Sequence, residues 1–367
     1  MFKLRKIIQK YFKSLGYALF KLLYGSINGK ISQPNNSDFI VEKIILDKSI
    51  NYKVYRCKNS RLYTNTVHDA AVIIKNKILE GTSYQYRDNN KNSICEENII
   101  FNIGTPRFLK KLNGTVFSLL TGGGGNSNYW HWLYDVLPRL YLLKKIIDFD
   151  KIDFFLFPAL NKKFQIESLD ILKIPKYKRI SSLKYRHINS KEIITTDHPY
   201  NILNDPFQDS DNIPNWIVNF LKESFLPSRK NNNLPRKFFI DRKDAPAAHN
   251  KLRFIINENE VKDILRLHGF EPITLSDLSF MDQVSLFNNA EYIVGLHGAG
   301  FSNLAFCKKG TKVLEIRSDH TGDMYKNLAI TVGANYDAIV EKGEKIQSIY
   351  QLGDIRVNLE KLLNKIS

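Results

Sequence analysis

A short loop, His297-Gly298-Ala299-Gly300, is the first place in this sequence where residue types and spacing indicate chemistry. It follows the apolar run Tyr292–Gly295 and precedes a short helical stretch from about Ser302. A glycine loop between a buried strand and a helix exposes backbone N–H groups to an anion. We therefore expect all four residues of the loop to contact phosphate, the alternative being glycines needed for conformation and a histidine that caps or packs.

Charged side chains in the same half of the chain could complete such a site. Arg242 and Arg253 flank the end of a strand expected at Lys237–Asp241, and a guanidinium can bind a diphosphate through paired hydrogen bonds. Glu315 ends the strand expected at Lys312–Ile316, where a carboxylate suits the hydroxyls of ribose. A solvated strand end is the alternative interpretation of Glu315.

A second set of candidate residues follows four consecutive glycines, 122–125, near the middle of the chain. His131 and Asp135 are four residues apart, so a helix places them on one face within hydrogen-bond reach. Such a pair could deprotonate an acceptor hydroxyl, or it could serve only in capping. The neighbouring residues predicted to lie on the acceptor side are Asn128, Trp130 and Trp132, although core packing is expected for at least one aromatic ring in this segment.

Metal ligands are not convincing in this sequence. Asp209-Ser210-Asp211 matches a short DxD pattern, but it lies in a polar, proline-flanked segment and does not follow a buried strand. Neither HExxH nor GxxxxGK[ST] occurs, which argues against zinc hydrolases and P-loop phosphotransferases. We predict no metal site and no cofactor.

The elements that must position these residues are clearest after about residue 237. Apolar periodicity predicts a strand at Lys237–Asp241, then strands and helices in regular alternation as far as Lys312–Ile316. The helices expected in this run are Glu258–His268, Phe280–Asn289 and Ser302–Phe306, and the further strands are Phe270–Leu275 and Tyr292–Gly295. Asn257 and Ser279 are expected to cap two of the helices, and Gly269 to end one. The pattern predicts a parallel sheet covered on both faces.

Two domains are expected, because 367 residues exceed the roughly 250–300 residues at which single cores stop growing. The segment 226–236 is rich in proline, asparagine and basic residues, so we predict the boundary there. The predicted parts are residues 1–37 as a helix and linker, 38–228 as an α/β domain of short strands and a long helix from Asn128, and 229–367 as the domain of the phosphate loop.

The N-terminal segment has a distinct pattern of charge and apolarity. The first 37 residues contain no Asp or Glu and seven Lys or Arg, and apolar residues recur at three- and four-residue steps. This predicts a basic amphipathic helix that lies on an anionic membrane and does not span it. A helix packed on the body of the protein is the alternative.

Composition limits the remaining classes of function. Three dispersed cysteines suggest neither a disulfide framework nor a zinc site, and a reducing cytoplasm fits them best. The net charge of +17 raises affinity for any phosphate-rich surface. A nucleic-acid-binding protein is a rival interpretation of this charge, but no recognition motif supports it, and we predict no nucleic acid partner.

Several motifs in order resemble those of glycosyltransferase family 61, which includes bacterial capsular-polysaccharide proteins, plant xylosyltransferases and animal N-acetylglucosaminyltransferases. The resemblance covers about residues 120–320. The matching segments are Asn128–Leu140, Ile240-Asp241-Arg242 with Arg253, Asn257-Glu258, Phe280–Gln283, Gly295–Leu304 and Glu315-Ile316. One departure is Asp241, where many relatives have serine before the arginine.

The resemblance implies a GT-B-like architecture, in which two Rossmann-like domains face a cleft. It implies inverting, metal-independent transfer of a sugar from a nucleotide-sugar, with a UDP-sugar favoured, to a hydroxyl of a capsule- or lipopolysaccharide-type glycan. Asp135 would be the preferred base, with His131 as its partner or substitute. The residues assigned to the nucleotide are Arg242, Arg253, His297, Gly298, Ala299, Gly300, Asn303 and Glu315. We further expect a cytoplasmic location at the inner face of the cell membrane, and a non-catalytic glycan-assembly scaffold is the main alternative.

Overall fold

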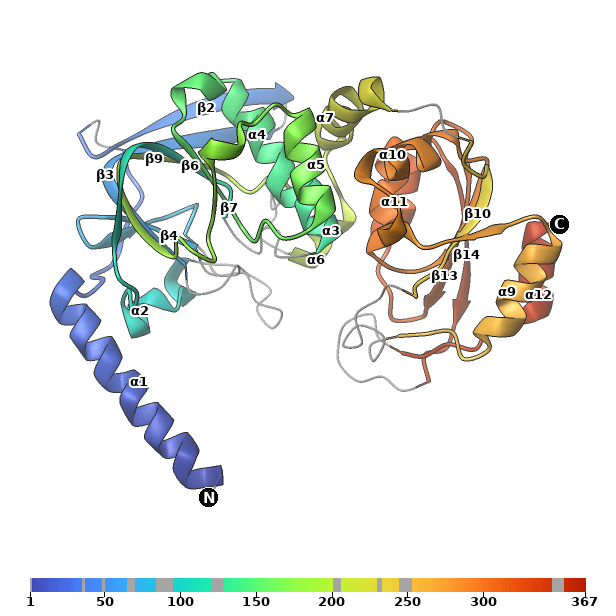
Figure 1. The fold of residues 1–367 in the computed structure, drawn as a ribbon, viewed down its shortest axis with the longest axis horizontal. Helices are drawn as coiled ribbons and strands as arrows, with labels where there is room; N and C mark the ends of the chain where they lie inside the picture. Colours follow the sequence, from blue (N-terminus) through green and yellow to red (C-terminus); the bar gives the residue numbers. More distant parts are fainter. Residues whose placement is uncertain are drawn as a thin grey trace. The chain divides into compact units, whose positions relative to one another are not determined.

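The chain divides into two compact units (Figure 1). The computed structural model describes residues 2–34, 37–47, 50–64, 70–83, 95–120, 128–200, 206–229, 233–243, 253–344 and 353–367. The first unit comprises Met1–Asn161 and Lys173–Pro206, and the second comprises Lys162–Leu172 and Phe207–Ser367. The predicted glycine loop at 122–125 lies outside the described residues.

The first unit is built around one sheet with short helices after its central strands. Its strands are β1 (Lys30–Ile31), β2 (Phe39–Asp47), β3 (Ile50–Thr64), β4 (Ala70–Ile74), β5 (Lys77–Leu79), β6 (Lys110–Ser118), β7 (Phe154–Phe157), β8 (Arg179–Ser181) and β9 (His187–Thr196). Its helices and helical turns are α1 (Phe2–Tyr24), η1 (Cys95–Glu97), α2 (Ile100–Ile103), α3 (Tyr129–His131), η2 (Trp132–Val136), α4 (Leu137–Lys144), η3 (Phe149–Lys151) and η4 (Lys176–Lys178).

The sheet of the first unit is mixed, which differs from the two Rossmann-like domains that we expected. Within the described part of the chain its strand order is β1-β5-β4-β3-β9-β6-β7-β8, with β2 paired to β3. The pairs β2–β3, β3–β4, β4–β5 and β3–β9 are antiparallel, whereas β9–β6, β6–β7 and β7–β8 are parallel. Only the β9-β6-β7-β8 part therefore has the strand direction of a Rossmann-like sheet, because tight hairpins connect β2 to β5 and impose antiparallel pairing.

The second unit follows the predicted alternation of strands and helices. Its strands are β10 (Lys237–Ile240), β11 (Glu271–Ile273), β12 (Tyr292–Leu296), β13 (Lys312–Ser318) and β14 (Asn335–Glu341). Its helices and helical turns are α5 (Lys163–Ile171), α6 (Pro206–Asp211), α7 (Asn215–Phe225), η5 (Leu226–Ser228), α9 (Glu258–Leu267), η6 (Leu275–Asp277), α10 (Phe280–Asn289), η7 (Ala299–Phe306), α11 (Met324–Thr331) and α12 (Leu359–Ile366).

The five strands of the second unit form a parallel sheet in the order β11-β10-β12-β13-β14. Figure 1 shows α9 and α12 on one face of this sheet and α10 and α11 on the other. All five residues of β12 are buried, which explains why the strand is an almost continuous apolar run. The prediction of a parallel sheet covered on both faces is confirmed.

The strand order reverses between β10 and β12. From β10 the chain moves outward to β11, then returns past β10 to β12 and continues to β14. In open parallel sheets, ligands bind beyond the carboxyl ends of the strands at such a reversal. The ends of β10 and β12 lie level, since Ile240 pairs with Gly295. The fold therefore places the segments after Ile240 and after Leu296 at the position where a ligand is expected.

Two of the three local helix signals are as predicted. The Ser279 hydroxyl accepts a hydrogen bond from the backbone N–H of Asp282 at 3.1 Å, and Gly269 ends α9 with a φ of +79°. Asn257 precedes α9 but does not cap it. Its amide instead pairs with both backbone groups of Val357, at 3.0 Å each, and so ties α9 to the segment before α12.

The second unit begins earlier along the chain than the boundary predicted after residue 228. Phe225 of α7 packs edge-on against the Phe280 ring of α10, with centroids 4.8 Å apart. The carboxylate of Glu167 in α5 accepts a hydrogen bond from the Phe280 N–H at 2.5 Å. These contacts place α5 and α7 in the second unit, although both precede the proline-rich segment. Within the predicted linker, β1 pairs in parallel with β5.

The three cysteines, Cys57, Cys95 and Cys307, are free and buried. Burial raises the pKa of the Cys95 and Cys307 thiols to about 12. These thiols stay protonated at neutral pH and are poor nucleophiles.

Candidate active site

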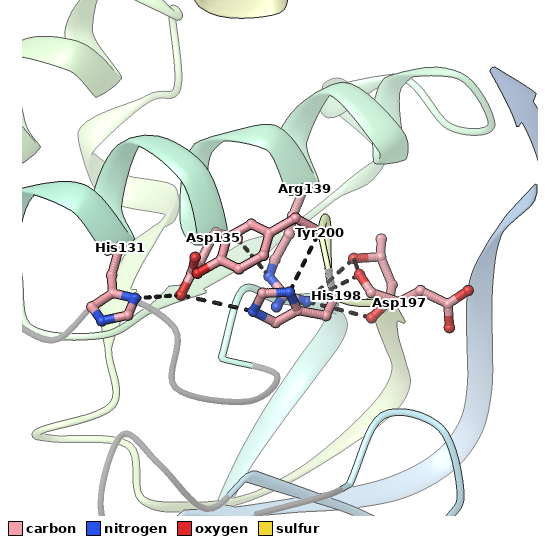
Figure 2. Close-up of polar contacts among 7 residues, drawn as sticks. His131, Asp135, Arg139, Asp197, His198 and Tyr200 are labelled. Carbon is pink, nitrogen blue, oxygen red and sulfur yellow. Dashed lines mark hydrogen bonds and ion pairs between the residues drawn. The ribbon is translucent and has the colours of Figure 1, made fainter. Parts of the chain in front are cut away.

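His131 and Asp135 lie on one helical surface in the first unit, as predicted. The Asn128 side chain begins this helix by accepting a hydrogen bond from the Trp130 N–H at 2.9 Å. The turn Trp132–Val136 is π-helical, a local widening that is frequent at functional sites. His131 Nδ1 lies 2.7 Å from Asp135 Oδ2 (Figure 2). The two side chains therefore form a histidine–carboxylate pair.

The two members of this pair differ in their access to solvent. The Asp135 side chain is 1% exposed, whereas that of His131 is 27% exposed. A reacting molecule can reach the imidazole, but the carboxylate is covered. The geometry thus favours His131 as the group that meets a substrate and Asp135 as the group that orients it.

A second histidine faces Asp135 from the opposite side, and the sequence analysis did not find it. His198 follows the end of β9, and its Nε2 lies 3.8 Å from Asp135 Oδ2 (Figure 2). The Tyr200 N–H points at His198 Nδ1 from 3.4 Å, which assigns the proton of neutral His198 to Nε2, facing the carboxylate. His198 is buried, so it acts on the site only through Asp135.

The charge of Asp135 is maintained against burial. Burial raises the pKa of a carboxyl, but the imidazoles of His131 and His198 outweigh it and hold the pKa of Asp135 below its usual range. Burial lowers the pKa of His198, and Asp135 opposes that shift. Asp135 is therefore an anion at neutral pH, held between two imidazoles.

Arg139 fixes the backbone beneath this pair. Its fully buried guanidinium donates to the Asp135 carbonyl oxygen at 2.8 Å, and at 3.4 Å to the carbonyl oxygens of Thr196 and Asp197 at the end of β9. The Asp197 carboxylate in turn accepts from Tyr55 and from the Lys53 N–H on β3. Figure 2 shows Arg139 extending from the helix toward the segment that carries Asp197 and His198. The helix, β9 and β3 are thus tied together at the candidate site.

The predicted acceptor-side residues separate by burial. Asn128 is exposed, and Trp130 is 4% exposed and stacks on Tyr134 with centroids 4.1 Å apart. Trp132 is fully buried beside Phe157, at 5.9 Å between centroids. A ring without exposed surface cannot stack on a sugar, so the prediction for Trp132 was wrong and this ring serves the core.

In the second unit, the predicted phosphate loop and Arg242 are neighbours. A β-carbon built on Gly298 would lie 3.9 Å from the Arg242 guanidinium carbon. The same atom would meet nothing closer than 3.7 Å, so the absent side chain leaves room beside a cation. Gly300 differs, because its β-carbon would approach Leu275 to 2.9 Å and Ile240 to 3.2 Å. Gly300 is therefore required by packing, and Gly298 is the loop glycine that leaves space for an anion.

Glu315 has a different role from the one predicted. It is fully buried, with one oxygen 2.5 Å from His297 Nδ1 and the other accepting from the Tyr336 hydroxyl at 2.5 Å. Burial and the nearby carboxylate raise the pKa of Tyr336, which keeps that hydroxyl a donor. Both oxygens of Glu315 are thus engaged within the protein. The arrangement orients His297, which is itself 2% exposed, and gives no geometric support to a contact between Glu315 and ribose.

Asn303 is also engaged inside the protein. Its amide donates to the Gln283 side-chain oxygen and to the Gly300 carbonyl oxygen, each at 3.2 Å. Since Asn303 is fully buried, these bonds hold the loop in place, and they do not reach toward a nucleotide.

A cavity of about 330 Å³ lies between α9 and the carboxyl ends of β10 and β12. Apolar and charged side chains both line it. The apolar side chains include Phe239, Val261, Leu265, Val294, Leu296 and Ile316; the cations are Arg242, Lys243, Arg253 and Lys262, with Glu258 beside them. Burial lowers the pKa of Arg253 to about 10, and the like charge of Arg242 adds to that shift. Two guanidinium groups are thus held close together, as a diphosphate site requires.

Asp241 pairs with two of the four cations that line this cavity. Its carboxylate accepts from Lys262 Nζ at 3.1 Å and lies 3.6 Å from Lys243 Nζ. The carboxylate of Asp241, where many relatives have serine, therefore pairs with Lys262 of α9.

No group of three or more His, Cys, Asp or Glu side chains within the described ranges could hold a metal ion. Asp209 and Asp211 of the DxD pattern lie on the short helix α6, and the backbone carbonyl of Asp211 accepts from Asn327 at 2.8 Å.

Comparison with known proteins supports an assignment to a family. The family described as Glycosyltransferase 61 matches residues 129–314, which is about half of the chain and includes both His131-Asp135 and the loop 297–300. The chain belongs to glycosyltransferase family 61.

The chain is also similar over a short stretch to animal proteins that are named as transferases. The chain is 28% identical over 95 residues to the EGF domain-specific O-linked N-acetylglucosamine transferase of Pan troglodytes, covering 24% of this chain and 18% of that protein. It is 27% identical over 89 residues to the protein of that name from Drosophila melanogaster, covering 23% and 17% respectively. The alignments thus span less than a fifth of the relatives' own length.

In this member of glycosyltransferase family 61, sequence reasoning missed the residues that hold the candidate site groups in place. His198 lies two residues after the end of β9, and its approach to Asp135 depends on how β9 and the helix pack, which the local sequence does not indicate. Arg139 lies within the residues that match the family, but the local sequence does not indicate that its side chain is buried. Tyr336 and Lys262 stand far from their carboxylate partners in sequence, and no local signal indicates them.

Proposed function

We propose that this protein is an inverting glycosyltransferase that moves a sugar from a nucleotide-sugar, in the first instance a UDP-sugar, to a hydroxyl of a surface glycan. Membership of the family supports glycosyl transfer. The observation that carries the mechanism is the pairing of a partly exposed His131 with a buried, ionised Asp135.

In the proposed reaction, His131 Nε2 takes the proton of the acceptor hydroxyl while the acceptor oxygen forms a bond to the anomeric carbon. The bond from that carbon to the diphosphate oxygen breaks at the same time, and the configuration at the carbon inverts. Asp135 holds the imidazole through Nδ1 and stabilises the imidazolium that forms. No metal is required in this scheme, because cations of the protein meet the departing charge.

The donor is assigned to the second unit. The apolar side chains of the cavity suit the nucleoside, and Arg242, Arg253 and the N–H groups after Gly298 suit the diphosphate. Glu315 and Asn303 support this site by fixing His297 and the loop. The names of the relatives make UDP-N-acetylglucosamine the first donor to test.

The donor assignment is tested by thermal unfolding with UDP-, GDP-, CMP- and CDP-sugars. A donor at a hundred times its dissociation constant should stabilise the fold by about 2.7 kcal/mol. An Arg242→Ala/Arg253→Ala variant should lose that stabilisation, whereas Lys308→Ala, an exposed lysine outside the cavity, should retain it. The absence of stabilisation by every sugar nucleotide would contradict the assignment.

The base assignment is tested by turnover. His131→Ala should lower kcat by about 10²–10⁴-fold, the usual contribution of general base catalysis, with unchanged donor stabilisation. Asp135→Asn should lower kcat as well, because it removes the charge that stabilises the imidazolium. Full activity of both variants would exclude the proposed base. Donor binding without turnover in the wild-type chain, across a panel of glycan acceptors, would favour the alternative of a non-catalytic scaffold.

A further inference from the structure

Helix α1 is attached to the first unit by one side of its C-terminal end. The Phe20 ring packs edge-on against Phe108, with centroids 5.2 Å apart. Lys21 Nζ donates to the Asn102 carbonyl oxygen at 2.8 Å, and the Tyr24 hydroxyl accepts from the Leu109 N–H at 3.1 Å. Figure 1 shows the remainder of α1 extending away from the sheet of this unit. The side of the helix that carries Phe20, Lys21 and Tyr24 is therefore the attached side.

The apolar stripe of α1 lies on the other side and is uncovered. The stripe consists of the eight apolar residues from Ile7 to Leu23 whose exposed fractions are given next. At 3.6 residues per turn these residues fall within an arc of about 160° around the helix axis, and Phe20, Lys21 and Tyr24 lie outside this arc. Their exposed fractions are 55% for Ile7, 47% for Ile8, 73% for Tyr11, 76% for Phe12, 71% for Leu15, 54% for Leu19, 84% for Leu22 and 55% for Leu23. In the described residues the stripe therefore does not pack on the first unit. A contiguous apolar surface of this kind marks an interaction site.

The charges on α1 are all positive. Arg5, Lys6, Lys10 and Lys13 are exposed, and no Asp or Glu occurs in the first 37 residues. At the same 3.6 residues per turn, Lys6, Lys10 and Lys13 lie opposite the stripe and Arg5 lies at its edge, and the long side chains of such a polar face can extend toward an interface. An anionic surface complements them, whereas a second copy of α1 would bring like charges together. The stripe is also wider than the two-position seam of a coiled coil.

We propose that α1 docks the protein on the surface of an anionic lipid bilayer, with the apolar stripe in the headgroup boundary and the cations on the lipid phosphates. In the described residues, no helix combines the length and apolarity needed to cross a bilayer. The attachment through Phe20, Lys21 and Tyr24 then holds the first unit beside the membrane. This inference does not depend on the proposed glycosyl transfer.

The test is sedimentation of the full chain with phosphatidylcholine vesicles, with and without phosphatidylglycerol. The wild-type chain should bind the anionic vesicles and bind the zwitterionic ones at least tenfold more weakly. Lys6→Gln/Lys10→Gln/Lys13→Gln should weaken binding about a hundredfold, since each cation near an anionic surface contributes roughly fivefold. Phe12→Ser/Leu15→Ser/Leu22→Ser should weaken it at least about tenfold by removing apolar burial.

A matched control carries three exposed lysines outside α1, as Lys144→Gln/Lys163→Gln/Lys308→Gln, and should bind like the wild type. Unchanged circular dichroism and thermal unfolding will show that each variant is folded. Wild-type binding by both α1 variants would overturn the proposal, as would equal binding to the two kinds of vesicle. If the wild-type chain ignores vesicles but forms a dimer that the serine variant dissociates, the stripe binds a second copy instead.

Discussion

At the scale of single residues, Asp135 is a carboxylate kept charged in a place that water does not reach. A buried charge costs several kcal/mol unless partners compensate it. Here His131 Nδ1 lies within hydrogen-bond distance of the carboxylate, His198 Nε2 faces the same oxygen from 3.8 Å, and Arg139 holds the backbone carbonyl of the same residue. His131 is the partner that solvent reaches, so one imidazole is available for chemistry while the other has only a structural contact with the carboxylate.

We expect His198 to be a positioning residue. His198→Phe removes the donor that faces Asp135, so kcat should fall about tenfold or more, with donor stabilisation unchanged. His198→Gln restores an N–H donor and should recover part of the lost rate. The measurement is kcat at saturating donor together with thermal unfolding. If the phenylalanine and glutamine variants lose equal activity, volume and not hydrogen bonding is what His198 provides.

At the scale of elements, the segment from β12 to η7 combines packing with an open position. Gly295 and Gly300 allow β12, Phe301, Ile240 and Leu275 to approach one another, because a β-carbon at either glycine would meet these side chains at 3.3 Å or less. Gly298 has no such neighbour and lies beside Arg242. Glycine is therefore needed at positions 295 and 300 for close packing, and at position 298 for the open space beside Arg242.

The two kinds of glycine should respond differently to alanine. Gly300→Ala overpacks the interior and should lower the free energy of unfolding by about 1–3 kcal/mol. Gly298→Ala has room and an extended backbone, so it should change stability by no more than about 0.5 kcal/mol, the usual range of a harmless substitution. It should instead weaken donor binding about tenfold, or about 1.4 kcal/mol, by occupying the space beside Arg242. Urea unfolding and donor titration of both variants check this; reversed effects would show that the packing and binding assignments are exchanged.

The start of β9 carries a titratable contact to α1. His187 is 1% exposed, its Nδ1 lies 2.9 Å from the Arg107 carbonyl oxygen, and its ring meets Tyr24 at 4.9 Å. Burial, aided by the Arg61 cation, lowers the pKa of His187 from an ordinary 6.5 to about 4. As the pH falls, His187 therefore binds a proton at a higher pH in the unfolded chain than in the folded protein. The contribution of His187 to the free energy of unfolding is complete above about pH 6.5 and is lost as the pH falls toward 4.

His187→Phe keeps a ring at this position and removes the titration. Between pH 7 and pH 5 the wild type should lose about 2 kcal/mol more unfolding free energy than the variant. Urea unfolding followed through Trp130 and Trp132, in a Trp216→Phe background, reports the first unit. Equal losses in the two proteins would mean that His187 titrates normally.

At the scale of the whole molecule, each candidate site belongs to one unit and lies at the carboxyl end of parallel strands. The His131–Asp135 pair is beside the end of β9, and the cationic cavity is beyond β10 and β12. Each unit has its own apolar core. The arrangement of the two units about a cleft, as in GT-B enzymes, stays a prediction, and so does a cytoplasmic location.

Because the cavity is formed by the second unit alone, its ligand should stabilise that unit first. UDP at a hundred times its dissociation constant should slow hydrogen exchange of the most protected amides in β10 and β12 by about a hundredfold. Amides of β3 and β9 in the first unit should change much less. Hydrogen exchange followed by mass spectrometry checks this, and stronger protection in the first unit would place the nucleotide there.

The sequence alone determined where strands and helices form if their local pattern is strong, and which candidate residues lie next to them. Phe280–Asn289 has the predicted bounds, and the strand predicted at Lys237–Asp241 and the helix predicted at Glu258–His268 each end one residue earlier in the structure, because apolar periodicity and caps act over a few residues. It did not indicate β14, an edge strand in which Ile339 alone is buried. The hydrogen bond from His131 to Asp135 was also predictable, since a helix places such residues one turn apart.

Only the tertiary structure decided how these residues are used. It buried Asp135 and Trp132, engaged both oxygens of Glu315, and brought His198 to a carboxylate 63 positions earlier in the chain. It also joined α5 to the second unit and left the stripe of α1 uncovered. Each of these outcomes depends on which elements pack together, and packing brings together groups that are distant in sequence. Local spacing therefore identifies candidate groups, and burial and partners decide whether each one meets solvent, a ligand or the core.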